Sequence, residues 1–328
     1  MPNFRPHALT TAALASALLV GCSSAGSEEA GEEAAQTRAV TTDQGEVTVP
    51  ADPQNVVVLN SALAGYFFAL DVPVAATLPQ TPGPAGADYL ETWAEEAEAD
   101  GTEMLPWGED GFNFEAVLAQ EPDLIVGGGQ GFPAAQAVEA YDRLGEIAPT
   151  VLVSSDLDTW QEQLSFIAGD LLEVPDREAE LLAGYDARVE EVAAAVDVPE
   201  APVEYVVMTS DGTPFTLPEE AGLPQTLAEV GFEPLPVAEE NPDMEAYGTG
   251  DSIELSTELV AEVFTAPSAF VLSFNDDLTS VAELSENPVY AALPAFEDGN
   301  AHDLPYWSYR ADYYRTMDLL DLVEEQFS

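Results

Sequence analysis

The sequence contains no lysine: its 7 basic residues are all arginines, they face 62 acidic residues, and the formal net charge is −55. Binding to nucleic acid or to anionic lipid headgroups needs a basic surface, so neither partner is expected. An acidic surface is typical of a salt-rich environment, where ions screen repulsion between like charges. Compositional drift in a GC-rich genome would explain the missing lysine but not the excess of acids.

Cysteine and histidine are also scarce, with one cysteine (Cys22) and two histidines. A single cysteine excludes an internal disulfide framework. Zinc or manganese sites need clustered ligands, and nucleophilic catalysis needs a Cys or Ser beside a His base, so no metal site, no cofactor and no enzymatic activity are expected. The run Gly127–Gly129 lacks the Lys-Ser/Thr of a phosphate-binding loop and predicts only a tight turn.

The one long apolar run lies at the N-terminus, where residues 8–20 precede Cys22. This run is too short for a stable membrane span and has the character of a signal-peptide core. The sequence Leu-Val-Gly-Cys at 19–22 resembles the lipobox of bacterial lipoproteins. The resemblance implies a signal peptide over 1–21, cleavage before Cys22, a lipid on its sulfur and attachment to the outer side of the cell membrane. Cleavage would leave 6 − 62 = −56 charges.

Residues 22–39 are small, polar and acidic, which predicts a flexible tether before an ordered domain that starts near Val40. Beyond it, short apolar runs alternate with helical patterns, which predicts an α/β fold with parallel sheets flanked by helices. The predicted strands are 55–59, 72–76, 123–127, 150–153, 203–208 and 269–273, and the predicted helices are 61–70, 114–119, 134–145, 159–172, 222–230, 255–264 and 312–326.

The longest helical pattern, 176–196, lies between Pro175 and Pro199 and divides the alternation into two halves. The sequence therefore predicts two α/β lobes, 40–174 and 199–328, joined by one long rigid helix over 175–198. Clefts between domains are preferred ligand sites.

Several short motifs follow one another in a distinctive order: 53–59, 112–118, 121–126, 141–150, 287–290 and 293–296. Their order and spacing resemble the class of periplasmic binding proteins whose lobes are joined by a rigid helix. That class serves importers of iron siderophores, haem and cobalamin. The run 309–314 entering the last helix is most similar to the ferric-enterobactin-binding branch. The resemblance implies a monomer that binds a ferric siderophore and delivers it to an ABC permease and its ATPase.

A ferric siderophore already satisfies the six ligand positions of iron, so the protein need offer only a wide bowl with aromatic walls and cations. An aromatic group with one arginine precedes the last helix, and a loop after a strand is where an α/β cleft collects ligand groups. The candidate ligand-binding residues are Tyr306, Trp307, Tyr309 and Arg310, with Phe215 by resemblance to the enterobactin branch, and Asn60, Trp107 and Gln130 from loops of the first lobe.

Arg310 has two interpretations: it pairs with ligand oxygens or stacks over aromatic rings, or it only bridges to Asp312 or another acid. No basic residue lies between Arg38 and Arg143, so the cleft loops of the first lobe bring no cation to a trianionic tris-catecholate. A hydroxamate or mixed-ligand siderophore is therefore as plausible as a catecholate. Haem or cobalamin binding by the same fold, and an acidic surface lipoprotein without a transport role, remain alternatives.

In the resembled class, one glutamate of each lobe meets arginines of the permease. By position these are Glu115 in the first lobe and Glu258 in the second. Because the joining helix resists bending, ligand binding is expected to cause a small closure rather than a wide hinge motion.

Overall fold

A computed structural model describes residues 36–275 and 279–328 of the chain. The predicted signal peptide, Cys22 and most of the predicted tether lie outside the described residues. The described part belongs to one compact unit that extends from Ala35 to Ser328. Within it, two five-stranded sheets define two lobes.

The sheet of the first lobe is parallel throughout and has the order β5-β4-β3-β8-β9. Two hairpins accompany it, β1–β2 and β6–β7. The strands are β1 (Thr37–Thr42), β2 (Gly45–Pro50), β3 (Val56–Val58), β4 (Val74–Thr77), β5 (Glu103–Met104), β6 (Trp107–Gly108), β7 (Gly111–Phe112), β8 (Leu124–Gly128) and β9 (Thr150–Val153). The helices are α1 (Ser61–Ala69), α2 (Ala94–Asp100), α3 (Phe114–Ala119), α4 (Phe132–Gly145) and α5 (Trp160–Ser165), with a 3-10 turn at Glu91–Trp93 and a π-helical segment at Phe166–Leu171.

The sheet of the second lobe has the order β12-β11-β10-β13-β14 and is mixed. Strands β10, β13 and β14 run parallel, whereas β11 and β12 pair antiparallel at one edge. The strands are β10 (Val203–Met208), β11 (Pro214–Thr216), β12 (Ile253–Glu254), β13 (Ser268–Ser273) and β14 (Ala301–Asp303). The helices are α7 (Gly222–Glu229), α8 (Val237–Glu240), α9 (Val260–Val263), α10 (Val281–Leu284), α11 (Pro288–Ala291) and α12 (Pro294–Glu297), with a 3-10 turn at Tyr306–Ser308.

The helix predicted over 255–264 was wrong in its first half, because α9 covers only Val260–Val263. Leu255 instead follows strand β12, and its N–H donates to the carbonyl of Pro214 at 2.9 Å. The helical spacing of the apolar residues at 255, 259 and 263 arises because a buried strand end and a short helix point into the same core.

The central strands are apolar on both faces because each face of the sheet packs against a different core. In β3, Val56 and Val58 belong to one buried cluster and Val57 to another. Strand β10 divides in the same way, with Val207 in the first of these clusters and Val206 in a third. The period of two in a strand sends alternate side chains to opposite faces. One cluster is therefore common to both lobes, since it contains residues of β3 and of β10.

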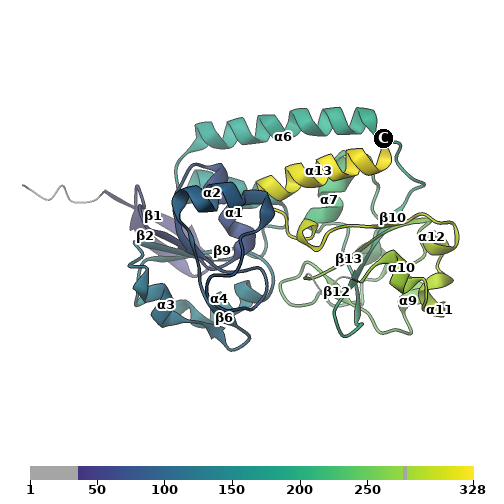
Figure 1. The fold of residues 1–328 in the computed structure, drawn as a ribbon, viewed down its shortest axis with the longest axis horizontal. Coiled ribbons are helices and arrows are strands. Elements are labelled where there is room, and N and C mark those ends of the chain that lie inside the picture. Colours follow the sequence, from purple (N-terminus) through teal and green to yellow (C-terminus); the bar gives the residue numbers. More distant parts are fainter. Residues whose placement is uncertain (1–35, 276–278) are drawn as a thin grey trace, which may run out of the picture. The chain divides into compact units, whose positions relative to one another are not determined.

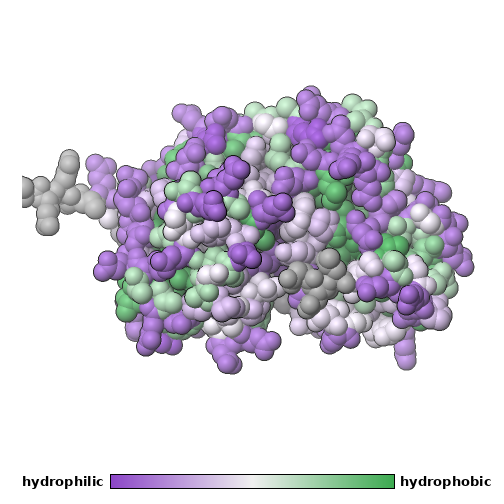
Figure 2. All heavy atoms as spheres, in the orientation of Figure 1, coloured by the Kyte–Doolittle hydropathy of each residue, from purple (hydrophilic) through white to green (hydrophobic). Residues whose placement is uncertain are grey.

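Two long helices cover this common core. Helix α6 (Pro175–Ala195) joins the lobes, and α13 (Tyr313–Phe327) packs beside it, as Figure 1 shows. Helix α13 also contacts α1 of the first lobe, although it follows the second lobe in sequence. Hydrophilic side chains are spread over the face of the described residues shown in Figure 2.

The ordered fold begins before Val40. Strand β1 starts at Thr37, within the range 22–39 that composition predicted as a tether, and it pairs with β2 along its whole length. The small polar residues there gave no apolar signal, but Val40 and Val49 are buried against the common core. A hairpin can order a polar segment through its backbone hydrogen bonds.

Glu204 is an unexpected buried acid, because it lies on β10 with 1% of its surface exposed. Its Oε2 accepts from the N–H of Ala266 at 2.8 Å, and burial raises its pKa to about 8. At a pH between the ordinary pKa of a glutamate and about 8, the native state therefore still holds the proton, whereas the unfolded chain has released it. Stability contributed by this group is lost as the pH rises toward about 8. Glutamine cannot lose a proton, so Glu204→Gln should avoid this loss. We expect the melting temperature of the variant minus that of the native chain to be roughly 5 °C larger at about pH 9 than at about pH 5.

Glu254→Gln, at an exposed position on β12, is the matched control, and its melting temperature should follow that of the native chain at every pH. A constant difference between Glu204→Gln and the native chain across this range would contradict the raised pKa of Glu204.

Candidate functional site: a cleft between the lobes

A cleft of about 340 Å³ lies between loops of the two lobes. The first lobe contributes segments after β4 and β8, and the second lobe contributes segments after β10 and β13, so the cleft lies at the carboxyl ends of parallel strands. Its lining consists of Gln80, Thr81, Pro82, Trp107, Gly131, Phe132, Pro133, Ala135, Thr209, Phe215, Tyr247, Gly248, Thr249, Asp251, Ser252, Phe274, Asn275 and Arg310.

Aromatic rings form much of the wall. In the second lobe Phe215 packs edge-on against Tyr247 and Phe274, with ring centroids 5.2 and 4.9 Å apart. In the first lobe the rings of Trp107 and Phe132 lie 6.1 Å apart. Such a wall suits a large ligand with flat or apolar outer surfaces.

Trp107 is fixed by its polar end. Its indole N–H donates to Oε1 of Gln136 at 2.6 Å, and the amide of Gln136 donates to the carbonyls of Gly108 and Glu109. This chain of hydrogen bonds ties the β6–β7 hairpin to helix α4. The orientation of the ring is therefore set before any ligand binds.

Arg310 lines the cleft, but it is paired with an acid of its own lobe. Its Nε donates to Asp251 Oδ2 at 2.6 Å and its Nη2 to Asp251 Oδ1 at 3.2 Å, a bidentate arrangement. The guanidinium lies 4.2 Å from the centroid of the Tyr309 ring. Of the two interpretations from sequence, the structure shows a bridge to an acid; that acid is Asp251, while Asp312 faces the buried Arg315.

Asp251 is held in its charged form. Its side chain is only 3% exposed, and although burial raises the pKa of the carboxyl, the charge of Arg310 and its hydrogen bonds lower it below the ordinary value. The pair is therefore ionic across the neutral pH range.

A hydrogen bond between described residues joins the lobes at the cleft. The N–H of Gly131, in the loop before α4, donates to Oγ1 of Thr249 in the second lobe at 2.9 Å. Gly131 has φ +84, and a Cβ at this position would lie 2.7 Å from Nη1 of Arg310. The backbone conformation requires glycine there, and a Cβ would also force the guanidinium of Arg310 to shift.

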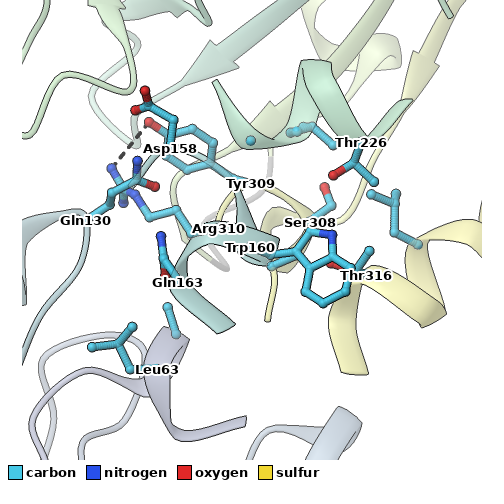
Figure 3. Close-up of a pocket in the computed structure, with 15 residues that line it drawn as sticks. Leu63, Gln130, Asp158, Trp160, Gln163, Thr226, Ser308, Tyr309, Arg310 and Thr316 are labelled. Atoms are coloured by element: carbon cyan, nitrogen blue, oxygen red, sulfur yellow. Dashed lines mark hydrogen bonds between the residues drawn. The ribbon is translucent and has the colours of Figure 1, made fainter. Parts of the chain in front are cut away.

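A smaller cavity of about 20 Å³ lies behind Arg310. Figure 3 shows residues from both lobes around it, together with the hydrogen bond from Arg310 Nη2 to the Tyr309 hydroxyl at 3.3 Å. Burial, together with the nearby charges of Glu162 and Glu220, raises the pKa of Asp158 in its wall. This space is too small for a siderophore and has room for about one water molecule.

The sequence-predicted site residues divide into three groups. Trp107, Phe215 and Arg310 line the cleft, and Tyr309 and Gln130 line the small cavity behind it. The third group lines neither cavity: it consists of Asn60 and of Tyr306 and Trp307, which lie in a 3-10 turn.

Asn60 has a structural role in this fold. Its side chain accepts from the N–H of Ala62 at the start of α1, and its amide donates to the carbonyls of Gly128 and Gln130. It thereby caps a helix and fixes the loop after β8.

Sequence reasoning missed four prominent groups of the cleft: Phe132, Tyr247, Asp251 and Phe274. Two glycines with positive φ, Gly248 and Gly250, lie between Tyr247 and Asp251 and mark a loop able to approach a ligand closely. That glycine spacing was the available signal. Among 62 acids, nothing in the sequence distinguished Asp251.

The two glutamates expected to meet a permease are both exposed, Glu115 in the first turn of α3 and Glu258 between β12 and α9. They lie on separate lobes. The described helices include none with the length and apolarity of a membrane span. Nor do residues 36–275 and 279–328 bring together three or more His, Cys, Asp or Glu side chains able to hold a metal ion.

Two α/β lobes, a single joining helix and a cleft at the strand ends define a substrate-binding protein. The chain belongs to the periplasmic binding protein family, whose model matches residues 56–306. Membership of this family implies an extracytoplasmic location and a binding role.

Among known proteins, the chain is 31% identical over 296 residues to the ferric enterobactin-binding periplasmic protein FepB of Escherichia coli O6:H1, covering 88% of this chain and 91% of that protein. Its fold is similar to that of holo-ViuP, with a TM-score of 0.75, 20% identity and coverage of 89% and 95%. It is also similar to that of Staphylococcus aureus SirA complexed with staphyloferrin B, with a TM-score of 0.70, 18% identity and coverage of 89% and 99%. These similarities confirm the two-lobed α/β fold.

The Arg310–Asp251 pair gives a prediction for stability. Arg310→Met leaves a buried carboxylate without its cation and should lower the free energy of unfolding by about 3–5 kcal/mol near neutral pH. The double variant Arg310→Met/Asp251→Leu removes that uncompensated charge and should recover most of the loss. Urea unfolding of the single and double variants measures both.

Arg177→Met is the control, because Arg177 pairs with Asp71 and Glu180, which are 80% and 70% exposed. Its loss should cost no more than about 1 kcal/mol. Equal stabilities of Arg310→Met and Arg177→Met would contradict a buried ion pair at the cleft.

Proposed function

We propose that this protein binds a ferric siderophore in the cleft between its lobes and delivers it to the permease of an ABC importer. The observation that carries the proposal is the aromatic cleft at the carboxyl ends of the strands, in a chain 31% identical to a ferric enterobactin-binding protein. The siderophore itself supplies the donor atoms that coordinate the iron, which fits a wall of rings and neutral polar groups rather than metal ligands.

The finer features of the proposal come from the sequence. The apolar run before Cys22 supports a signal peptide and a lipid anchor on that cysteine, which would hold the protein at the outer side of the cell membrane. The acidic segment after Cys22 would act as the tether.

A fluorescence titration tests the ligand class. We expect saturable quenching of tryptophan emission at sub-micromolar concentration by a ferric siderophore, since Trp107 lines the cleft. Haem, cobalamin and ferric citrate are the comparison ligands. Tyr247→Ala, which removes an exposed ring from the cleft wall, should weaken affinity about tenfold.

Leu118→Ala on α3 is the matched control, because Leu118 is 58% exposed, Tyr247 is 54% exposed, and only Tyr247 lines the cleft. Saturable binding of haem or cobalamin alone would contradict siderophore binding and would assign the protein to the haem- or cobalamin-binding proteins of the same fold. No response to any of these ligands would contradict a transport role.

The permease contact is tested by charge reversal. Glu115→Arg/Glu258→Arg should abolish uptake of the ferric siderophore into cells while leaving its affinity for the purified protein unchanged, because the two exposed glutamates lie outside the cleft. Glu98→Arg/Glu286→Arg makes the same charge change at other exposed positions and should preserve uptake. Normal uptake by the Glu115/Glu258 variant would exclude these residues as the permease contacts.

A further inference from the structure

The cleft carries no net charge on its described lining. Within residues 36–275 and 279–328, the charged side chains lining it are Arg310 and Asp251, and +1 − 1 = 0. The other lining groups are aromatic, aliphatic or neutral polar, the last including Gln80, Thr81 and Thr209. An anion entering the cleft therefore meets one cation whose charge is already compensated.

The compensation is built into the structure. Asp251 accepts two hydrogen bonds from Arg310, at 2.6 and 3.2 Å, and a third from Oγ1 of Thr249 at 3.2 Å. Because the carboxylate is 3% exposed, releasing Arg310 to a ligand would leave a buried, uncompensated negative charge. Arg310 can present remaining donors to a ligand, but its positive charge stays matched by Asp251.

The other described arginines do not supply a second cation to this lining. Arg315 is 1% exposed and lies 3.8 Å from Asp312. Arg143 stacks on Phe114 at 3.7 Å in a neighbouring groove that also contains Glu109, Asp110 and Glu139. The remaining ones, Arg38, Arg177 and Arg188, pair with acids elsewhere on the fold.

We propose that the cleft selects ferric complexes without net negative charge, of the neutral tris-hydroxamate kind, over trianionic ferric tris-catecholates. This inference rests on the proposed function and specifies its ligand class. A trianion would be drawn out of water into a low-dielectric cleft whose described lining has no net positive charge, in a chain of net charge −55. A neutral complex is not repelled by the net negative charge of the chain, and it needs no compensating cation in the cleft. The proposal separates this chain from its E. coli relative, which is named for ferric enterobactin, a tris-catecholate.

The test compares two probes on the purified native protein, ferrichrome as the neutral tris-hydroxamate and ferric enterobactin as the trianion. At about 50 mM salt, where screening is weak, ferrichrome should bind at least about tenfold more tightly. Raising the salt concentration should narrow this ratio, because only the trianion is repelled. This comparison decides the proposal without any variant.

The outcomes separate the two claims. Tighter or equal binding of ferric enterobactin at low salt would overturn the charge selectivity while ferric-siderophore binding stands. Binding of neither probe, with no response to any other ferric siderophore, would overturn the proposed function and the selectivity with it.

Asp251→Asn tests the source of the selectivity. Asparagine keeps an oxygen that accepts from Arg310 but removes the negative charge, so the preference for ferrichrome should fall by about tenfold. Asp298→Asn, at an exposed position after α12, changes the net charge equally and should leave the preference unchanged. Equal effects of the two variants would overturn the role of Asp251.

Discussion

The cleft depends on one continuous apolar core that both lobes share. Alternate residues of β3, β8, β9, β10 and β13 pack into it from the two sheets, and α6 and α13 cover it. Separating the lobes would expose buried apolar surface to water, which costs about 25 cal/mol of free energy per Å² exposed. The two sets of strand ends are therefore held in a nearly fixed relation, which favours a pre-formed cleft that closes by a small amount on its ligand.

The buried polar groups at the start of α13 connect this core to the cleft. Asp312 caps the helix by accepting from the N–H of Arg315 at 3.0 Å, and Arg315 donates to the carbonyl of Arg310 at 3.2 Å. Gly65 of α1 lies so close to Asp312 that a Cβ there would overlap the carboxylate. The backbone that carries Arg310 is thus anchored in the core, and its side chain projects from a rigid base into the cleft.

Charge compensation is what distinguishes the cleft chemically. The protein has about nine acids for every basic residue, so an arginine without an acidic partner would be exceptional. Arg310 follows this expectation, because it pairs with Asp251. The arginine then acts as a positioned donor and a flat surface beside Tyr309 rather than as a free positive charge. In the proposed function, recognition of the ligand therefore rests on shape, aromatic contact and neutral hydrogen bonds.

The sequence by itself determined the α/β class, the division into lobes by a long helix and most strands, because buried strands and amphipathic helices leave periodic apolar patterns within a few residues of chain. It also led to Trp107 and Arg310, and by family resemblance to Phe215, as residues of the cleft. Only the tertiary structure decided that Asn60 caps a helix rather than lining the cleft, and that Asp251 neutralises Arg310. Asp251 and Arg310 lie 59 positions apart, and a pairing between distant side chains leaves no local pattern when acids occur throughout the chain.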